Sequence, residues 1–265
     1  MRLESPVGAA TWLPVLFFKK ILKFDRAEGS KGEKRSAARH PVGQTFPVKA
    51  VLNVVDRDST GQLIEEGRRR TDWGGWMLNL SATGASMQLH PAALAVRGDP
   101  CVLRLSFDNS ILEIPGRIAH FRAQANYALC GVSLDFPDAE VHRAYLQLLE
   151  PIKVGDSFRP VDPGRVKQDS PDMKKEQYSG DAGTRLTVWR TADGSTIYGF
   201  ELLIGPYSVT GSNQSPELDV QAAGGSQEVD LSPGACDEMR RLYRWIVPNL
   251  AKSVPADVRK FLGRF

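Results

Sequence analysis

The chain has 265 residues, of which 42% are hydrophobic and 25% charged. This is the composition of a soluble globular protein with one or two domains. A net charge of +3 is too small for a protein that coats nucleic acid, so no nucleic-acid polymer is expected as a partner. Three distant cysteines, Cys101, Cys130 and Cys236, match no zinc spacing, so we expect reduced thiols, no metal and a cytoplasmic protein.

Residues 1–33 form an apolar and basic N-terminal leader followed by a linker. The apolar run at 12–18 is too short to cross a bilayer, which takes about 20 apolar residues. It also lacks the features of a signal peptide. Residues 12–24 alternate apolar side chains with lysines. This pattern suits an amphipathic helix, which could make a peripheral membrane contact or simply pack on its own protein.

The next region, 34–150, is rich in short β-type segments with turn residues between them. Close spacing of such segments predicts a sandwich or a barrel. A change to helical periodicity then predicts one helix over 137–149, which starts at a proline. The expected strands are 46–55, 73–80, 85–89, 101–107, 111–121 and 127–134.

Beyond the helix, residues 151–183 contain many Pro, Gly, Asp, Lys and Ser, and this composition predicts a flexible linker. Residues 184–265 then show strand-like segments around an Ala-Asp-Gly turn, followed by an amphipathic helix over 236–250 and a short terminal helix. They predict a small α+β domain, whose role the sequence does not indicate.

Two motifs carry the functional argument. Lys34 and Arg35 begin a basic segment that ends at Arg39, which gives the spacing RxxxR before the first strand. Residues 79–84 read Asn-Leu-Ser-Ala-Thr-Gly, the pattern NxSxxG, at a turn between two expected strands. Either motif alone is weak, but their order on a domain of six strands and a helix is informative.

In this order and setting, the motifs resemble the signature of the PilZ family, over roughly residues 34–150. The resemblance implies a mainly β fold, with a six-stranded PilZ-like barrel and a closing C-terminal helix, followed here by the small α+β unit. It also implies cyclic di-GMP as the ligand, with no further cofactor. By resemblance, Arg35 and Arg39 contact phosphate and guanine, Lys34 adds charge, and Asn79, Ser81 and Gly84 bind guanine.

The chemistry of these residue types suits such a ligand. An arginine donates through a rigid fork to phosphate oxygens or to the O6 and N7 atoms of guanine. The amide of Asn79 both donates and accepts. Gly84 would either adopt a positive φ or let the backbone approach the ligand. The spacing of forty residues between Arg39 and Asn79 indicates an insertion over 56–72.

Other functions remain to be weighed. No Walker loop, G-x-S-x-G or HExxH motif is present, so we do not expect an enzyme or catalytic residues. The main alternative is a protein–protein adaptor whose barrel binds no nucleotide. It would dock a protein partner through flanking segments, with Tyr243, Trp245 and the neighbouring arginines on the C-terminal helix. We interpret Trp73 and Trp76 as barrel packing.

Overall fold

The computed structural model describes residues 37–56, 62, 70–108, 110–224 and 229–265. The predicted leader, and with it the proposed membrane contact at 12–24, lies outside these residues, as do Lys34 and Arg35. The described chain forms two compact units. The first holds 48–76 and 87–145, and the second holds 37–47, 77–86 and 146–265.

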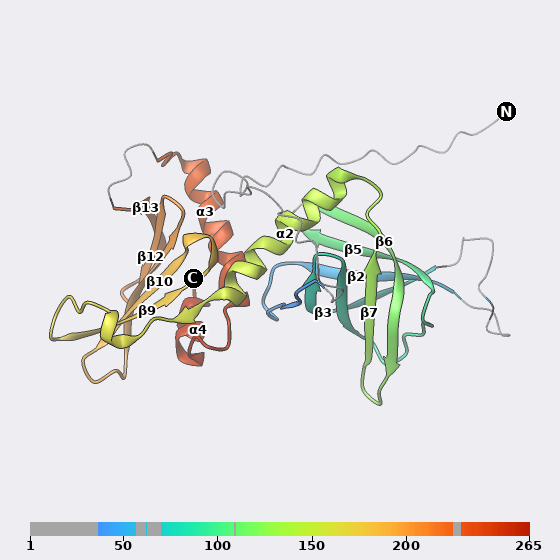
Figure 1. The fold of residues 1–265 in the computed structure, drawn as a ribbon, viewed down its shortest axis with the longest axis horizontal. Helices are drawn as coiled ribbons and strands as arrows, with labels where there is room; N and C mark the ends of the chain where they lie inside the picture. Colours follow the sequence, from blue (N-terminus) through green and yellow to red (C-terminus); the bar gives the residue numbers. More distant parts are fainter. Residues whose placement is uncertain (1–36, 57–61, 63–69, 109, 225–228) are drawn as a thin grey trace. The chain divides into compact units, whose positions relative to one another are not determined.

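Six strands close into an antiparallel barrel (Figure 1). Neighbouring strands are hydrogen-bonded in the order β3-β2-β5-β6-β7-β4, and β4 pairs with β3 again. The predicted fold class is therefore confirmed by the strand order. The strands are β2 (Lys49–Val55), β3 (Arg70–Ser81), β4 (Gly84–Leu89), β5 (Pro100–Phe107), β6 (Ser110–Ala123) and β7 (Ala128–Leu134).

The alternation of apolar and polar residues explains why these segments form a barrel. Along β5, every second side chain is buried, because successive side chains of a strand point to opposite faces. The register aligns Leu103 with Leu52 on β2 and with Ile114 on β6. All three are fully buried, so a row of apolar contacts crosses three strands. Loss of one such Leu side chain typically costs about 2–5 kcal/mol.

The pair β6–β7 requires a glycine at one position. His120 lies opposite Gly131, and a Cβ on Gly131 would lie 1.9 Å from the imidazole ring. The ring therefore occupies the space of the missing side chain.

Helix α2 (Ala139–Ser157) follows the barrel strands. The side chain of Asp138 accepts hydrogen bonds from the backbone N–H groups of Glu140 and Val141, which caps the first turn. The predicted apolar stripe is buried at Tyr145, Leu148 and Leu149. The helix is longer than predicted, because it continues through Pro151.

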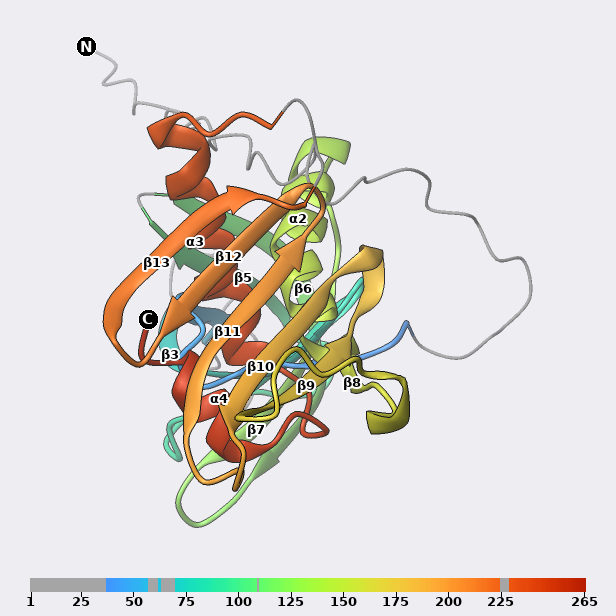
Figure 2. The same ribbon diagram turned by 90° about the vertical axis from the view of Figure 1, so that its left-hand side faces the viewer.

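A second sheet is an antiparallel meander, in which each strand pairs with its sequence neighbour (Figure 2). Its order is β13-β12-β11-β10-β9-β8. Two short 3-10 helices, η1 (Pro163–Arg165) and η2 (Asp181–Gly183), interrupt the chain before β10. The strands are β8 (Arg159–Pro160), β9 (Met173–Ser179), β10 (Arg185–Thr191), β11 (Ile197–Ile204), β12 (Tyr207–Ser212) and β13 (Ser215–Ala222).

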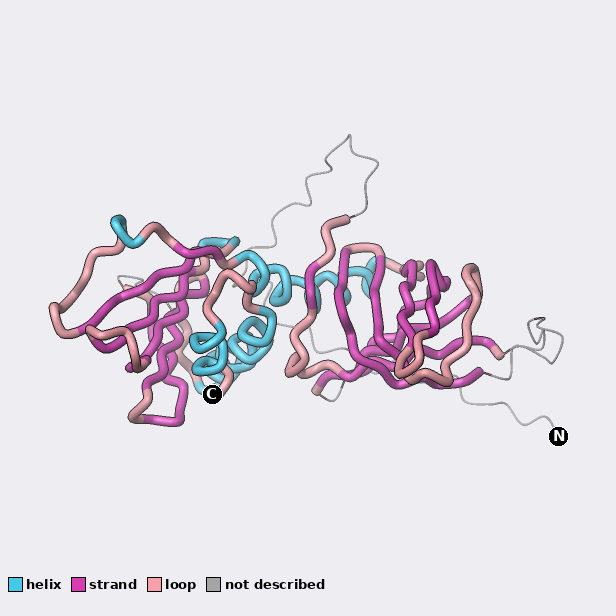
Figure 3. Tube along the Cα trace, turned by 90° about the horizontal axis from the view of Figure 1, so that it is seen from below, coloured by secondary structure: helices cyan, strands magenta, loops and turns pink. Residues whose placement is uncertain are grey.

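Three short helices cover one face of this sheet (Figure 3). They are α3 (Pro233–Ile246), the 3-10 helix η3 (Val247–Asn249) and α4 (Ala256–Leu262). Phe200 on β11 stacks on Tyr243 at 5.5 Å between ring centroids and meets Phe261 edge-on at 6.3 Å. This aromatic cluster joins the helices to the sheet.

The segment 151–183 differs from the flexible linker that its composition predicts. It contains the end of α2, β8, and β9, and β9 pairs with β10 over its whole length. Few large apolar residues are needed there, because β9 lies near the sheet edge and buries mainly Tyr178. Helix α2 continues through Pro151 because the neighbouring side chains of Ile152 and Val154 are buried and hold it in place.

Candidate functional site

The structure brings the end of the first motif to the second motif. Strand β1 (His40–Pro41) pairs antiparallel with the end of β3, with His40 opposite Leu80 and Pro41 opposite Asn79. Arg39 immediately precedes the paired residues and is exposed. Because the pairing is antiparallel, the chain before His40 runs in the direction of the NxSxxG turn, and Arg39 lies on that side of the pair. We call residues 37–47, which contain β1, the strap.

The NxSxxG segment is a tight turn between β3 and β4. Asn79 is half-buried near the end of β3, whereas Ser81 is buried. The Ser81 hydroxyl donates to the backbone carbonyl of Gly84 at 3.2 Å, which holds the turn closed. Ser81 therefore has a structural role in the turn, and Asn79 is the more accessible of the two side chains.

Gly84 begins β4 and is not among the described glycines with positive φ, which are Gly98, Gly183, Gly194 and Gly205. The first explanation for this glycine, a left-handed backbone, is therefore wrong. Close approach of a ligand to the backbone stays a prediction.

Beyond β1, the strap is anchored on the helices of the second unit. Nδ1 of His40 lies 3.0 Å from the Asp156 carboxylate at the end of α2. The backbone N–H of Gly43 donates to Oδ1 of Asn249 at 2.8 Å. The rings of Phe46 and Trp245 meet edge-on at 5.4 Å. Three contacts of different kinds thus fix the segment directly after Arg39.

Gly43 is required at this anchor. A Cβ there would lie 1.9 Å from the carbonyl oxygen of Pro248, closer than any real contact. Asn249 is buried, and its amide nitrogen donates to the carbonyl of Trp245 at 2.7 Å. That bond fixes the orientation of the amide, so that its oxygen is directed to Gly43. Sequence reasoning missed Asn249 and Asp156, because they lie 206 and 116 positions from their partners.

Two interpretations of aromatic residues are corrected. Trp76 is 64% exposed rather than packed in the barrel. It lines an open cavity of about 590 Å³ in the first unit. Conversely, Tyr243 and Trp245, which the adaptor hypothesis placed on a docking surface, are 1% and 2% exposed and belong to the core. Trp73, half-buried opposite Leu52, is closer to the packing role expected.

The two thiols of the barrel are not reactive groups of the site. Cys101 and Cys130 are buried, and burial raises the pKa of both thiols to about 12. Cys236 is half-buried and free. Among the residues that the structure describes, no group of three His, Cys, Asp or Glu could hold a metal ion. No helix in the same part of the chain has the length and apolar content to cross a membrane.

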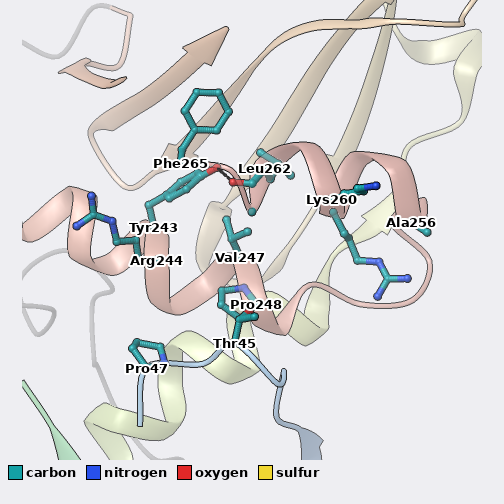
Figure 4. A pocket seen from close by; sticks show the side chains of 12 residues that line it. Thr45, Pro47, Tyr243, Arg244, Val247, Pro248, Ala256, Lys260, Leu262 and Phe265 are labelled. Carbon is teal, nitrogen blue, oxygen red and sulfur yellow. Dashed lines mark hydrogen bonds between the residues drawn. The ribbon is translucent and has the colours of Figure 1, made fainter. Parts of the chain in front are cut away.

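The second unit also carries a cavity of about 610 Å³, between the strap and the C-terminal helices (Figure 4). Thr45 and Pro47 of the strap form part of its lining. Basic side chains of α3 and α4 form another part of the lining. No sequence motif predicts that these side chains lie together.

The similarity of this chain to known proteins lies among solved structures. No family model matches the sequence, and no curated protein matches it. Among solved structures, the chain is similar to the crystal structure of the PilZ domain of CeSA from a cellulose-synthesizing bacterium, with 18% sequence identity and a TM-score of 0.27. The similarity covers 43% of this chain and 96% of that one.

Proposed function

We propose that the protein is a receptor for cyclic di-GMP, and that the ligand binds between the RxxxR segment and the NxSxxG turn. The observation that supports this most is the β1–β3 pairing, in which His40, the residue after Arg39, lies opposite Leu80 of the NxSxxG segment. The last residue of the first motif thus lies in the chain directly before a strand that pairs with the start of the second motif.

The exposed guanidinium of Arg39 pairs with a phosphate or with the O6 and N7 edge of guanine. Asn79 offers an acceptor and two donors to a second guanine edge. Arg35 and Lys34, just upstream in the chain, add two more positive charges to the same segment. A ligand with two phosphates and two guanines matches this set of groups.

The anchored strap provides the route to an output. Binding at Arg39 acts on a segment whose next residues contact Asp156, Asn249 and Trp245. Ligand-dependent ordering of residues 25–40 would therefore be transmitted to the C-terminal helices. The second unit is then the part of the protein that responds to the nucleotide.

Calorimetric titration of the full chain with cyclic di-GMP tests this function. We expect binding that weakens about tenfold or more in Arg39→Ala and in Asn79→Ala, because each removes a hydrogen bond to a charged or buried group. Arg185→Ala removes an exposed arginine elsewhere in the second unit and serves as the matched control. Absence of binding to the wild-type chain, or equal affinity in all four proteins, would refute the proposal.

A further inference from the structure

The cavity of about 610 Å³ beside the strap has an apolar floor. Tyr243, Val247 and Leu262 line it and are themselves almost fully buried, and Phe265 adds a further ring. The Tyr243 hydroxyl donates to the carbonyl of Leu262 at 2.8 Å, so the buried base of the cavity contains no unsatisfied tyrosine hydroxyl. A volume in this range accommodates a few side chains of a partner or a small ligand.

Positive charge surrounds this floor. Arg244, Arg259 and Lys260 line the cavity, and no Asp or Glu side chain does. In the described part of the chain, no carboxylate lies within ion-pair distance of these three cations. Arg259 uses its Nε to donate to the carbonyl of Val254, which leaves its terminal nitrogens for a ligand.

Other arginines of the same helix behave differently. Arg240 forms an ion pair with Asp237 at 2.8 Å, and Arg241 with Glu238 at 3.5 Å. The acidic residues of α3 thus neutralise Arg240 and Arg241 but not Arg244. Within α3, all of whose residues the structure describes, Arg244 at the cavity is therefore the arginine without a carboxylate partner.

The arrangement of these groups narrows the chemistry of an occupant. Arg244 lies at one end of the cavity and Lys260 at the other, with Tyr243, Val247 and Leu262 between them (Figure 4). An extended segment with an apolar residue between acidic ones would place carboxylates at both ends and an apolar side chain on the floor.

We propose that this cavity is a docking site for an acidic peptide segment of a partner protein, in which a large apolar residue is flanked by Asp or Glu. Carboxylates pair with Arg244 and Lys260, and Arg259 supplies a third donor. Thr45 and Pro47 place the strap in contact with the bound segment. This proposal does not rest on the proposed nucleotide binding, because no residue of the RxxxR or NxSxxG motif lines the cavity.

Fluorescence anisotropy of a labelled peptide, Ser-Asp-Glu-Phe-Leu-Glu-Asp-Ser, with the full chain tests the proposal. We expect saturable binding that weakens about tenfold in Arg244→Gln with Lys260→Gln, because two charge-assisted hydrogen bonds are lost. The matched control, Lys167→Gln with Arg185→Gln, removes two exposed cations elsewhere in the unit and should bind as the wild type does. Circular dichroism verifies that both double variants fold.

Two further peptides separate the parts of the site. One has Asn and Gln for the acidic residues, and the other has Ser for Phe and Leu. We expect each to bind at least tenfold more weakly, since both charge and the apolar core are needed. Equal binding of the Ser peptide would reveal unspecific charge attraction and overturn the proposal, as would no binding at millimolar protein. If the wild-type chain forms a dimer that the Arg244→Gln, Lys260→Gln variant does not form, the cavity binds a second copy of the chain, and the proposal of a partner peptide is overturned.

Discussion

Gly43→Ala should destabilise the second unit, because no space exists for a side chain where the strap meets η3. The new Cβ would lie 1.9 Å from the Pro248 carbonyl oxygen and 2.6 Å from its carbon. Relief of this overlap needs a backbone shift, which typically costs about 1–3 kcal/mol. It would also break the 2.8 Å hydrogen bond to Asn249, worth about 1 kcal/mol. We therefore expect a loss of about 2–4 kcal/mol in the free energy of unfolding.

The strap could instead detach, and the expected loss is then similar. Phe46 is only 7% exposed, and release of such a side chain to water costs roughly 1.5–3 kcal/mol, in addition to the lost hydrogen bond. Urea denaturation followed by tryptophan fluorescence measures the effect. Gly74→Ala is the control, because a Cβ there meets nothing within 4 Å. Equal denaturation midpoints for the two variants would refute the assignment of the strap anchor.

Three further predictions follow from packing and charge. Gly131→Ala should destabilise the barrel by about 1–3 kcal/mol because its Cβ would meet the His120 ring, and His120→Ala should restore part of the loss in a double-mutant cycle. Cys101 and Cys130 should react with Ellman's reagent at pH 8 only after denaturation, because burial raises the pKa of both thiols to about 12, whereas Cys236 should react in the native protein; rapid reaction of all three would contradict the buried assignment. The hydrogen bond from Arg190 lowers the pKa of Asp257 below 3.8 in the folded protein. The ionised carboxylate therefore stabilises the fold above pH 3.8, and this stabilisation is lost as the pH falls through the folded-state pKa. Thermal unfolding should depend less on pH below 3.8 in Asp257→Asn than in the wild type.

Sequence patterns were sufficient for the barrel. Alternation in segments such as 101–107 predicts strands because each of these strands has one buried face, and the helix predicted to start at Pro137 begins at Ala139. Composition wrongly predicted a flexible linker at 151–183. There, β9 is stabilised by pairing with β10 rather than by its own apolar residues.

The candidate site was partly within reach of the sequence. Motif order predicted that the RxxxR and NxSxxG segments belong together. The structure describes the first motif from residue 37 onward, and Arg39 directly precedes the strand β1 that pairs with β3. The strap anchor was out of reach, because the contacts of His40 and Gly43 join residues more than a hundred positions apart. The exposure of Trp76 could not be predicted from the sequence either, because an aromatic residue in a strand is usually packed.

We propose that the RxxxR and NxSxxG motifs form one binding site for cyclic di-GMP. The most direct measurement is the affinity of the full chain for cyclic di-GMP, compared with cyclic di-AMP and with the Arg35→Ala, Arg39→Ala double variant. We expect the wild type to bind cyclic di-GMP and the double variant to lose binding. Adenine in place of guanine should weaken binding, because the O6 acceptor is lost. Unchanged affinity in the double variant, or no preference for guanine, would contradict the proposal.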